Sequence, residues 1–298
     1  MSGQLKEVRD RIKSVKSTQQ ITKAMKMVSA AKLKRATDAI VQMRPYANRL
    51  NKMLKNILSN LDGDVNTSFG TERETTRAAV IVVTSNRGLC GAFNTNVIKG
   101  AVARIEENYA HLNNTQNLSI ICVGKKGFDF FRKRYSKCNI INDFGDLYSD
   151  LSFDNVSRVA QYVMDKFEDG TYDAVDVAYG RFKNAGMQFP EVAQFLPVEK
   201  IKGEGTGDDK HKADYIFEPS KEELLEYLVP SILQTTFQKF VLDTHASEHG
   251  ARMTAMDKAT ENAEDMVKEL KISYNKARQE AITKELSEIV GGAAALGG

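Results

Sequence analysis

The 298-residue sequence lacks tryptophan and holds only three cysteines and five prolines. It also lacks an apolar run near the roughly 18 residues that a membrane-spanning helix needs, since the longest obvious run covers residues 78–83. The first sixteen residues contain no apolar stretch typical of a signal peptide. Cys90, Cys122 and Cys138 are widely spaced and odd in number, which favours reduced thiols over a disulfide framework. We therefore expect a soluble cytoplasmic protein.

Charge is distributed unevenly, although the whole chain carries a formal net charge of only +3. Residues 1–56 hold fourteen Lys and Arg against three Asp and Glu, whereas residues 220–298 hold nine against thirteen. A basic segment is typical of contacts with nucleic acid or an anionic membrane, but a basic and an acidic helix in one chain also attract each other. We favour internal pairing and protein contacts, because the basic segment has Tyr46 as its lone tyrosine for base stacking. A coiled coil that binds nucleic acid stays as an alternative.

Both ends of the chain show the apolar period of long amphipathic helices. One helix is predicted over residues 4–60, where Pro45 is the only helix breaker, and a second over residues 220–290, ended by a pair of glycines. Whether Pro45 and Pro230 kink or interrupt these helices is left open. Helices of this length need a partner for their apolar stripes, so the sequence predicts a long antiparallel coiled coil of the two ends.

The middle of the chain alternates short apolar runs with helical segments. Strands are predicted at residues 78–84, 118–123, 139–143, 173–182 and 191–198, and helices at 94–109, 127–134 and 154–167. This order predicts an α/β fold with a mostly parallel, doubly wound sheet, that is, a central Rossmann-like domain. The predicted divisions are a terminal helix and linker at 1–75, the α/β domain at 76–200, a polar loop at 201–219 and a second terminal helix at 220–298.

A glycine-containing turn, TSNRGLCGAFN, follows the first predicted strand, where a Rossmann sheet holds its dinucleotide. Its glycines, Gly88 and Gly91, do not have the G-x-G-x-x-G spacing, and the sequence has no G-x-x-x-x-G-K-[ST] loop. We interpret the stretch as a tight strand-to-helix turn. Cys90 within it has no histidine near it in sequence to act as a base, although proximity in space stays open.

Residues 245–249 read HASEH, a literal match to the H-x-x-E-H pattern of one class of zinc peptidases. His245 and His249 lie one helical turn apart, so they share the face that such a zinc site needs. A catalytic zinc also needs a third ligand and a cleft, and the flanking sequence continues as a long helix. We favour polar contacts on a helix face over a zinc peptidase, and expect neither a metal nor a cofactor.

Four blocks of the sequence resemble the gamma subunit of F-type ATP synthases. They are SVKSTQQITKAMKMVSAAKLKRA at 14–36, SNRGLCGAFN at 85–94, SEHGARMTAMDKATENA at 247–263 and NKARQEAITKELSEIVGGAAAL at 275–296. The blocks stand in the family's order and cover essentially the whole chain, and the terminal blocks are the most specific. The sequence has no additional cysteine pair like that of the redox-regulated chloroplast form, which favours a bacterial protein.

The resemblance implies a central-stalk rotor without a catalytic site of its own. In that family the paired helices enter a ring of three alpha and three beta subunits, which holds the catalytic sites mostly on beta. The α/β domain joins the epsilon subunit and the c-ring, so the chain is expected on the cytoplasmic face of the bacterial inner membrane through the complex only. Residues that match the family's contacts with the ring are Met25, Arg252, Arg278, Gln279, Thr283, Glu285 and Glu288; those that match contacts with epsilon or the c-ring are Tyr215 and Glu218.

Overall fold

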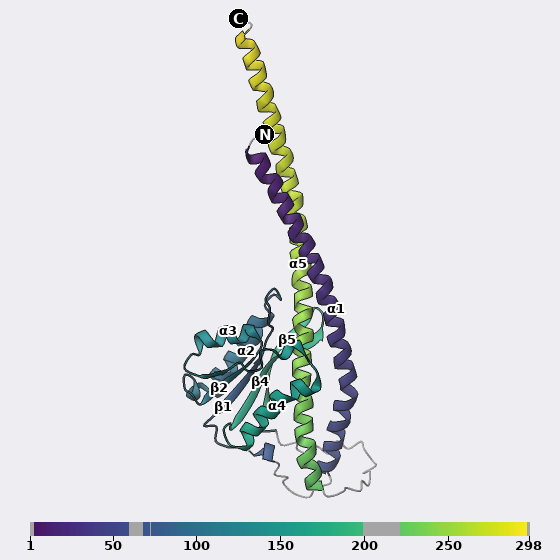
Figure 1. Cartoon of the computed structure of the whole chain (residues 1–298), viewed down its shortest axis with the longest axis vertical. Helices are drawn as coiled ribbons and strands as arrows, with labels where there is room; N and C mark the ends of the chain where they lie inside the picture. Colours follow the sequence, from purple (N-terminus) through teal and green to yellow (C-terminus); the bar gives the residue numbers. More distant parts are fainter. Residues whose placement is uncertain (1–2, 60–67, 72, 199–220, 297–298) are drawn as a thin grey trace. The chain divides into compact units, whose positions relative to one another are not determined.

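The computed structural model describes residues 3–59, 68–71, 73–198 and 221–296. These residues form two compact units. The terminal unit consists of the described residues of 1–30 and 252–298, and the central unit consists of those of 31–251. Two long helices, α1 (Gly3–Ser59) and α5 (Lys221–Leu296), contribute to both units (Figure 1). The domain limits expected at residues 75, 200 and 219 stay a prediction.

Both predicted terminal helices are confirmed, and each continues through its proline, Pro45 in α1 and Pro230 in α5. The predicted end of the second helix at residue 290 is wrong, because α5 runs through Gly291 and Gly292 to Leu296. A glycine weakens a helix by only about 1 kcal/mol relative to alanine. The alanines that follow the glycine pair favour the helix again, and this explains why the pair does not end α5.

The central unit holds a five-stranded sheet in the order β3-β2-β1-β4-β5. Its strands are β1 (Ala78–Val83), β2 (Leu118–Val123), β3 (Asn139–Ile141), β4 (Ala174–Asn184) and β5 (Met187–Leu196). The first four strands are parallel, and β5 pairs antiparallel with β4 as an edge strand. The predicted strands and the mostly parallel sheet are confirmed. Strands β1 and β2 are fully buried, which explains why their sequences are apolar except for Ser119 in β2.

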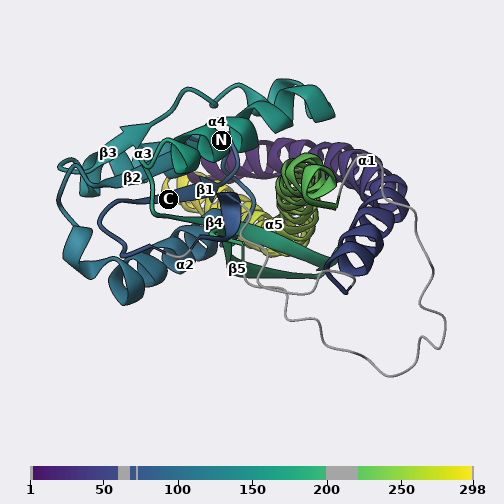
Figure 2. The same cartoon turned by 90° about the horizontal axis from the view of Figure 1, so that it is seen from below.

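Helices cover both faces of this sheet. One face packs against α2 (Phe93–Asn108) and α3 (Lys125–Arg134), and the other against α4 (Phe153–Glu168) and the first part of α5. Figure 2 shows α2 and α4 on opposite sides of the strands. Short 3₁₀ helices lie in the connections, at Ser68–Gly70, Ala110–Leu112 and Leu147–Ser149. The doubly wound arrangement predicted from the sequence is thereby confirmed.

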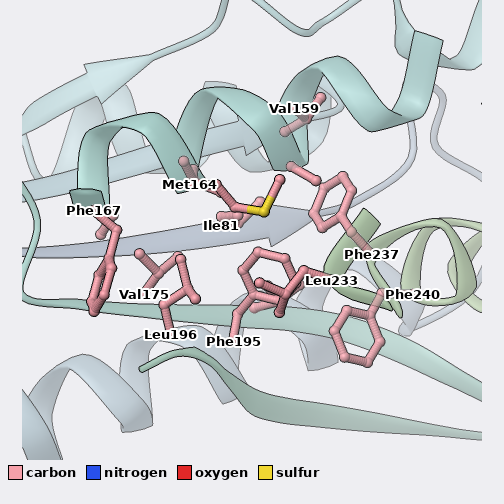
Figure 3. Packing of buried hydrophobic residues seen from close by; sticks show 14 of the residues in the cluster. Ile81, Val159, Met164, Phe167, Val175, Phe195, Leu196, Leu233, Phe237 and Phe240 are labelled. Carbon is pink, nitrogen blue, oxygen red and sulfur yellow. The ribbon is translucent and has the colours of Figure 1, made fainter. Parts of the chain in front are cut away.

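Large side chains build the first part of α5 into the α/β core (Figure 3). Phe237 is fully buried, with its ring centroid 5.9 Å from that of Phe195 on β5. Phe240 stacks on Tyr179 of β4 with ring centroids 4.3 Å apart. Full burial of one such side chain stabilises the fold by roughly 1.5–3 kcal/mol. The core of the α/β domain therefore includes a segment far from the strands in sequence.

Gly124 brings the end of β1 close to the start of α3. Its φ is +111°, and a Cβ at this position would lie 2.0 Å from the carbonyl oxygen of Thr84. The close approach allows the Gly127 amide to donate to Thr84 Oγ1 at 2.9 Å. Only glycine meets both the backbone angle and the space at this position.

We expect Gly124→Ala to lower the free energy of unfolding of the full-length protein by about 3 kcal/mol or more, through backbone strain and the clash with Thr84. Urea unfolding followed by circular dichroism measures this loss. Gly186→Ala is the matched control, because a Cβ there comes no closer than 3.7 Å to its nearest neighbour. Similar unfolding midpoints for the two variants would show that the β1–α3 approach tolerates a side chain.

Candidate functional site

In the terminal unit, α1 and α5 pair in opposite directions. Polar contacts join them at three levels: Arg9 with Tyr274, Thr22 with Thr260, and Lys26 with Asp257. Residue numbers fall along α5 as they rise along α1, so the predicted antiparallel pairing is confirmed. The Lys26–Asp257 pair joins the basic helix to the acidic one, but both side chains are partly exposed. Such a pair contributes about 0–1 kcal/mol, so it affects the alignment of the two helices more than the stability of their pairing.

The last turns of α5 continue past the N-terminal end of α1 (Figure 1). Residues 282–293 of this segment are all exposed. Apolar side chains lie on neighbouring turns here, with exposed fractions of 49–67% at Ile282, Leu286, Ile289 and Val290. No described residue covers them. Apolar surface grouped in this way is typical of an interaction site.

Most of the predicted ring-contact residues lie on this exposed end of α5. Those with exposed side chains are Arg278, Gln279, Thr283, Glu285 and Glu288. Lys284 Nζ lies 4.0 Å from Glu288 Oε1, an exposed ion pair that does not hold either side chain firmly. The structure therefore brings these five residues together on one accessible segment. Their roles as contacts stay a prediction.

The remaining predicted contact residues lie elsewhere. Met25 on α1 and Arg252 on α5 belong to the terminal unit, where Met25 is half-buried and Arg252 is only 8% exposed. Arg252 is therefore a packed side chain and not a freely exposed one. Tyr215 and Glu218 fall outside the described residues, so their predicted contacts stay a prediction too.

The two histidines of the HASEH stretch face each other on α5, as their spacing predicts. His245 Nε2 lies 3.1 Å from His249 Nε2. His249 is buried, and the ring of the half-buried Tyr148 lies 6.0 Å from that of His245, centre to centre. Burial raises the pKa of the Tyr148 hydroxyl, and the nearby Glu248 adds to the effect. Across the described ranges, no group of three His, Cys, Asp or Glu side chains is placed to hold a metal ion.

The glycine-containing turn after β1 uses its hydrogen-bonding groups within the chain. The Ser85 amide donates to Asn94 Oδ1 at 2.9 Å, and the Lys125 amide donates to Asn86 Oδ1 at 2.9 Å. Amides at such turns are the donors that a Rossmann fold offers to a phosphate. The Cys90 thiol is 1% exposed and accepts from the Asn94 side-chain amide at 3.2 Å. These contacts fit the interpretation as a structural turn.

Helix α5 also occupies the place beside β1 and β4 where open α/β sheets bind ligands. The Gly180 amide donates to Thr244 Oγ1 at 3.1 Å, and Ser247 Oγ donates to the Gly180 carbonyl at 3.0 Å. A Cβ on Gly180 would lie 2.6 Å from the ring of Phe93. The crevice at this edge of the sheet is thus filled by packed protein.

A buried charged group in the sheet was missed by the sequence analysis. Asp176 on β4 is 1% exposed and accepts from Arg104 Nε at 2.7 Å and from the Tyr109 hydroxyl at 2.9 Å. Its hydrogen bond raises the pKa of the Arg104 guanidinium, and burial followed by the Asp176 charge raises that of Tyr109. The signal was present, because Asp176 is the only charged residue in the apolar run AVDVAYG. Its partners, on and just after α2, could not be read from that run.

A cavity of about 400 Å³ lies in the central unit between α1, β4 and α5. Its charged lining residues are Arg44, Arg181, Lys239 and Asp243. Asp243 is 6% exposed, and burial raises the pKa of its carboxyl group to about 6 against the opposing effect of the three cations. The sequence analysis missed this cavity because its walls come from three segments far apart in the chain.

The comparisons with known proteins agree along the whole chain. A family model described as ATP synthase matches residues 4–296. The ATP synthase gamma chain of Cytophaga hutchinsonii is 52% identical over 295 residues, with 98% of each chain covered, and that of Flavobacterium psychrophilum is 51% identical over 297 residues, with 99% covered. Among solved structures, a chain of the Euglena gracilis mitochondrial ATP synthase, OSCP/F1/c-ring, matches with a TM-score of 0.68 and 26% identity, over 99% of this chain and 95% of that one. A chain of the Tetrahymena thermophila central stalk and c-ring matches with a TM-score of 0.55 and 25% identity, over 80% and 99%.

The fold and the exposed helical end define a class of subunit that combines a pair of terminal helices with an α/β domain. None of the described helices is long and apolar enough to cross a membrane. The chain belongs to the ATP synthase gamma-chain family, and it is the central-stalk subunit of that complex. The resemblance stated from the sequence is thereby confirmed.

The raised pKa of Asp243 predicts a pH-dependent stability. A carboxyl group whose pKa is about 6 in the folded chain, against 3.8 ordinarily, stabilises the fold below pH 4 and loses this contribution as the pH rises through 6. We expect Asp243→Asn to match the natural protein in unfolding free energy near pH 4 and to exceed it by about 2 kcal/mol at pH 8. Urea unfolding at both pH values measures the difference. A difference that does not change with pH would contradict the assignment.

Proposed function

We propose that this chain couples proton-driven rotation of the c-ring to conformational changes at the beta-subunit catalytic sites during ATP synthesis and hydrolysis. The observation that carries the proposal is the uncovered apolar end of α5, in a chain that belongs to the gamma-chain family. Inside a ring of alpha and beta subunits, Ile282, Leu286 and their neighbours would find the cover that the chain itself does not provide.

The coupling follows from asymmetry. Two unlike helices cannot touch three equivalent beta subunits in the same way, so each rotational position favours a different set of open and closed beta conformations. The difference in contact free energy between beta states then becomes a difference in nucleotide affinity. The chain acts as a mechanical effector and has no catalytic site of its own; the catalytic sites lie on beta.

The contacts with the ring are proposed at the residues that match the family's pattern. Arg278 and Gln279 are the strongest candidates for polar contact with a loop of beta, since both are exposed on adjacent positions of α5. Thr283, Glu285 and Glu288 extend the same segment. Met25 and Arg252 are proposed to support coupling from within the helix pair, because their side chains are partly or fully packed.

The α/β domain, residues 76–200, is proposed as the foot that joins the epsilon subunit and the c-ring, with Tyr215 and Glu218 near that contact. The chain is then held at the cytoplasmic face of the bacterial inner membrane through the complex only. No nucleic acid partner is proposed, because the α1–α5 ion pair gives the basic helix an acidic protein partner within the chain.

The double variant Arg278→Ala plus Gln279→Ala tests the ring contact. We expect ATP turnover by the complex reconstituted with alpha and beta to fall about tenfold or more, because a lost hydrogen bond to a charged group costs roughly 1.5–3 kcal/mol. ATP-driven proton pumping in vesicles reconstituted with the whole complex should fall with it. The natural chain alone should hydrolyse no ATP.

The matched control is Asn275→Ala plus Lys276→Ala, which removes two exposed polar side chains from the turn before. Both double variants should assemble equally well, as judged by size-exclusion chromatography of the complex. If turnover and pumping were unchanged in the Arg278 and Gln279 variant, or reduced equally in the control, these residues would not be the contact.

A further inference from the structure

The cavity between α1, β4 and α5 has charged and apolar walls that no function described above uses. It lies wholly within the central unit, and its volume of about 400 Å³ falls in the range of small-molecule sites, roughly 300–1,000 Å³. Apolar side chains from each of the three elements, Met43, Phe182 and Ile232, form part of its lining. The remaining lining mixes further apolar residues with polar and charged ones, and small-molecule sites use this mixture for affinity and orientation.

Two of the cations in the lining make no close ion pair within the described residues, although both attract the Asp243 carboxyl group at longer range. Arg44 on α1 and Lys239 on α5 make no ion pair or hydrogen bond with any residue in the described part of the chain. Arg181 on β4 differs, because its Nε donates to Glu191 on β5. With three cations against one carboxyl group the lining keeps a net positive charge, and the two cations without a close ion pair are long side chains on different helices. Such a pair fits an anionic group better than a neutral one.

Asp243 adds a carboxyl group that is buried at the cavity wall without an ion pair within the described ranges. The charges around it are Arg44 on α1, Lys239 on α5, Arg181 on β4 and Glu191 on β5. An ionised carboxylate only accepts hydrogen bonds, so a ligand beside it must offer a proton. A fully ionised anion without a proton would be repelled by it.

We propose that this cavity binds a small phosphate monoester, with its phosphate between Arg44 and Lys239, its apolar part against Met43 and Phe182, and one proton shared between the phosphate and Asp243. A monoester suits the site because its second pKa lies near 6, so the phosphate carries or releases a proton in the same pH range as this carboxyl group. One shared proton turns the repulsion between two anions into a charge-assisted hydrogen bond. The site is independent of the proposed coupling role, since it includes none of the ring-contact residues.

Calorimetric titration of the purified full-length chain with phenyl phosphate tests the proposal. We expect saturable binding at one site and at least about a tenfold loss of affinity in the double variant Arg44→Gln plus Lys239→Gln. Arg49→Gln plus Lys52→Gln is the control, because it removes the same charge from exposed positions of α1 that do not line the cavity. Circular dichroism establishes that each variant is folded.

The shared proton gives a second readout that charge alone would not move. Titrations at pH 7 in buffers of different ionisation enthalpy should show proton uptake on binding, and Asp243→Asn should abolish the uptake while it keeps the affinity, since the amide can donate to the phosphate. Inorganic phosphate is the second probe. If phosphate binds more weakly than phenyl phosphate, the apolar part of the ligand contributes and a monoester is supported. If the two bind equally, Arg44 and Lys239 bind the phosphate group alone, and the ligand is free phosphate.

Three results would overturn the proposal: no saturable heat with phenyl phosphate, an equal loss of affinity in the test and control double variants, or tight binding of phenol in place of the two phosphates. Without saturable heat, the cavity does not bind the ligand. An equal loss in both double variants would show a general effect of net charge, and tight binding of phenol would show that the cavity selects apolar ligands. None of these results depends on reconstitution with other subunits, so the ligand site and the coupling role are tested independently.

Discussion

The structure depends on how the long helix α5 is held along its length, because no helix of 76 residues can leave its apolar side chains in water. Its first part is built into the α/β core through fully buried side chains such as Phe237 and Val241. Its middle pairs with α1 through polar contacts and small or apolar side chains such as Ala263 and Val267. Its last turns have no cover within the described residues.

The two modes of contact, burial in the α/β core and pairing with α1, differ in strength. Burial of large side chains in the α/β core contributes roughly 1.5–3 kcal/mol each, whereas an exposed pair such as Lys26–Asp257 contributes at most about 1 kcal/mol. The strongest attachment of α5 is therefore to the domain proposed as the foot. Firm attachment to this domain is what the proposed coupling role requires of α5.

The sequence predicted the elements well wherever one physical signal dominated. The short, mainly apolar runs at 78–83 and 118–123 predicted strands, and the long apolar stripes predicted both terminal helices. The prediction failed at Gly291 because glycine lowers helix propensity without forcing a turn. Asp176 with Arg104, and the cavity around Asp243, depend on contacts between distant segments, which no local pattern encodes.

The same helix explains why a Rossmann-like sheet lacks the ligand crevice of its class and has a cavity in another place. Thr244 and Ser247 of α5 bond to Gly180, so they fill the edge of the sheet beside β1 and β4. The preceding turns of α5, from Ile232 to Asp243, line a cavity together with α1 and with Arg181 and Phe182 of β4. The cavity between these three elements is lined by Arg44 of α1, Arg181 of β4 and Lys239 of α5, among others. The packing of α5 against the α/β domain thus fills the crevice at one edge of the sheet and leaves a cavity at another place.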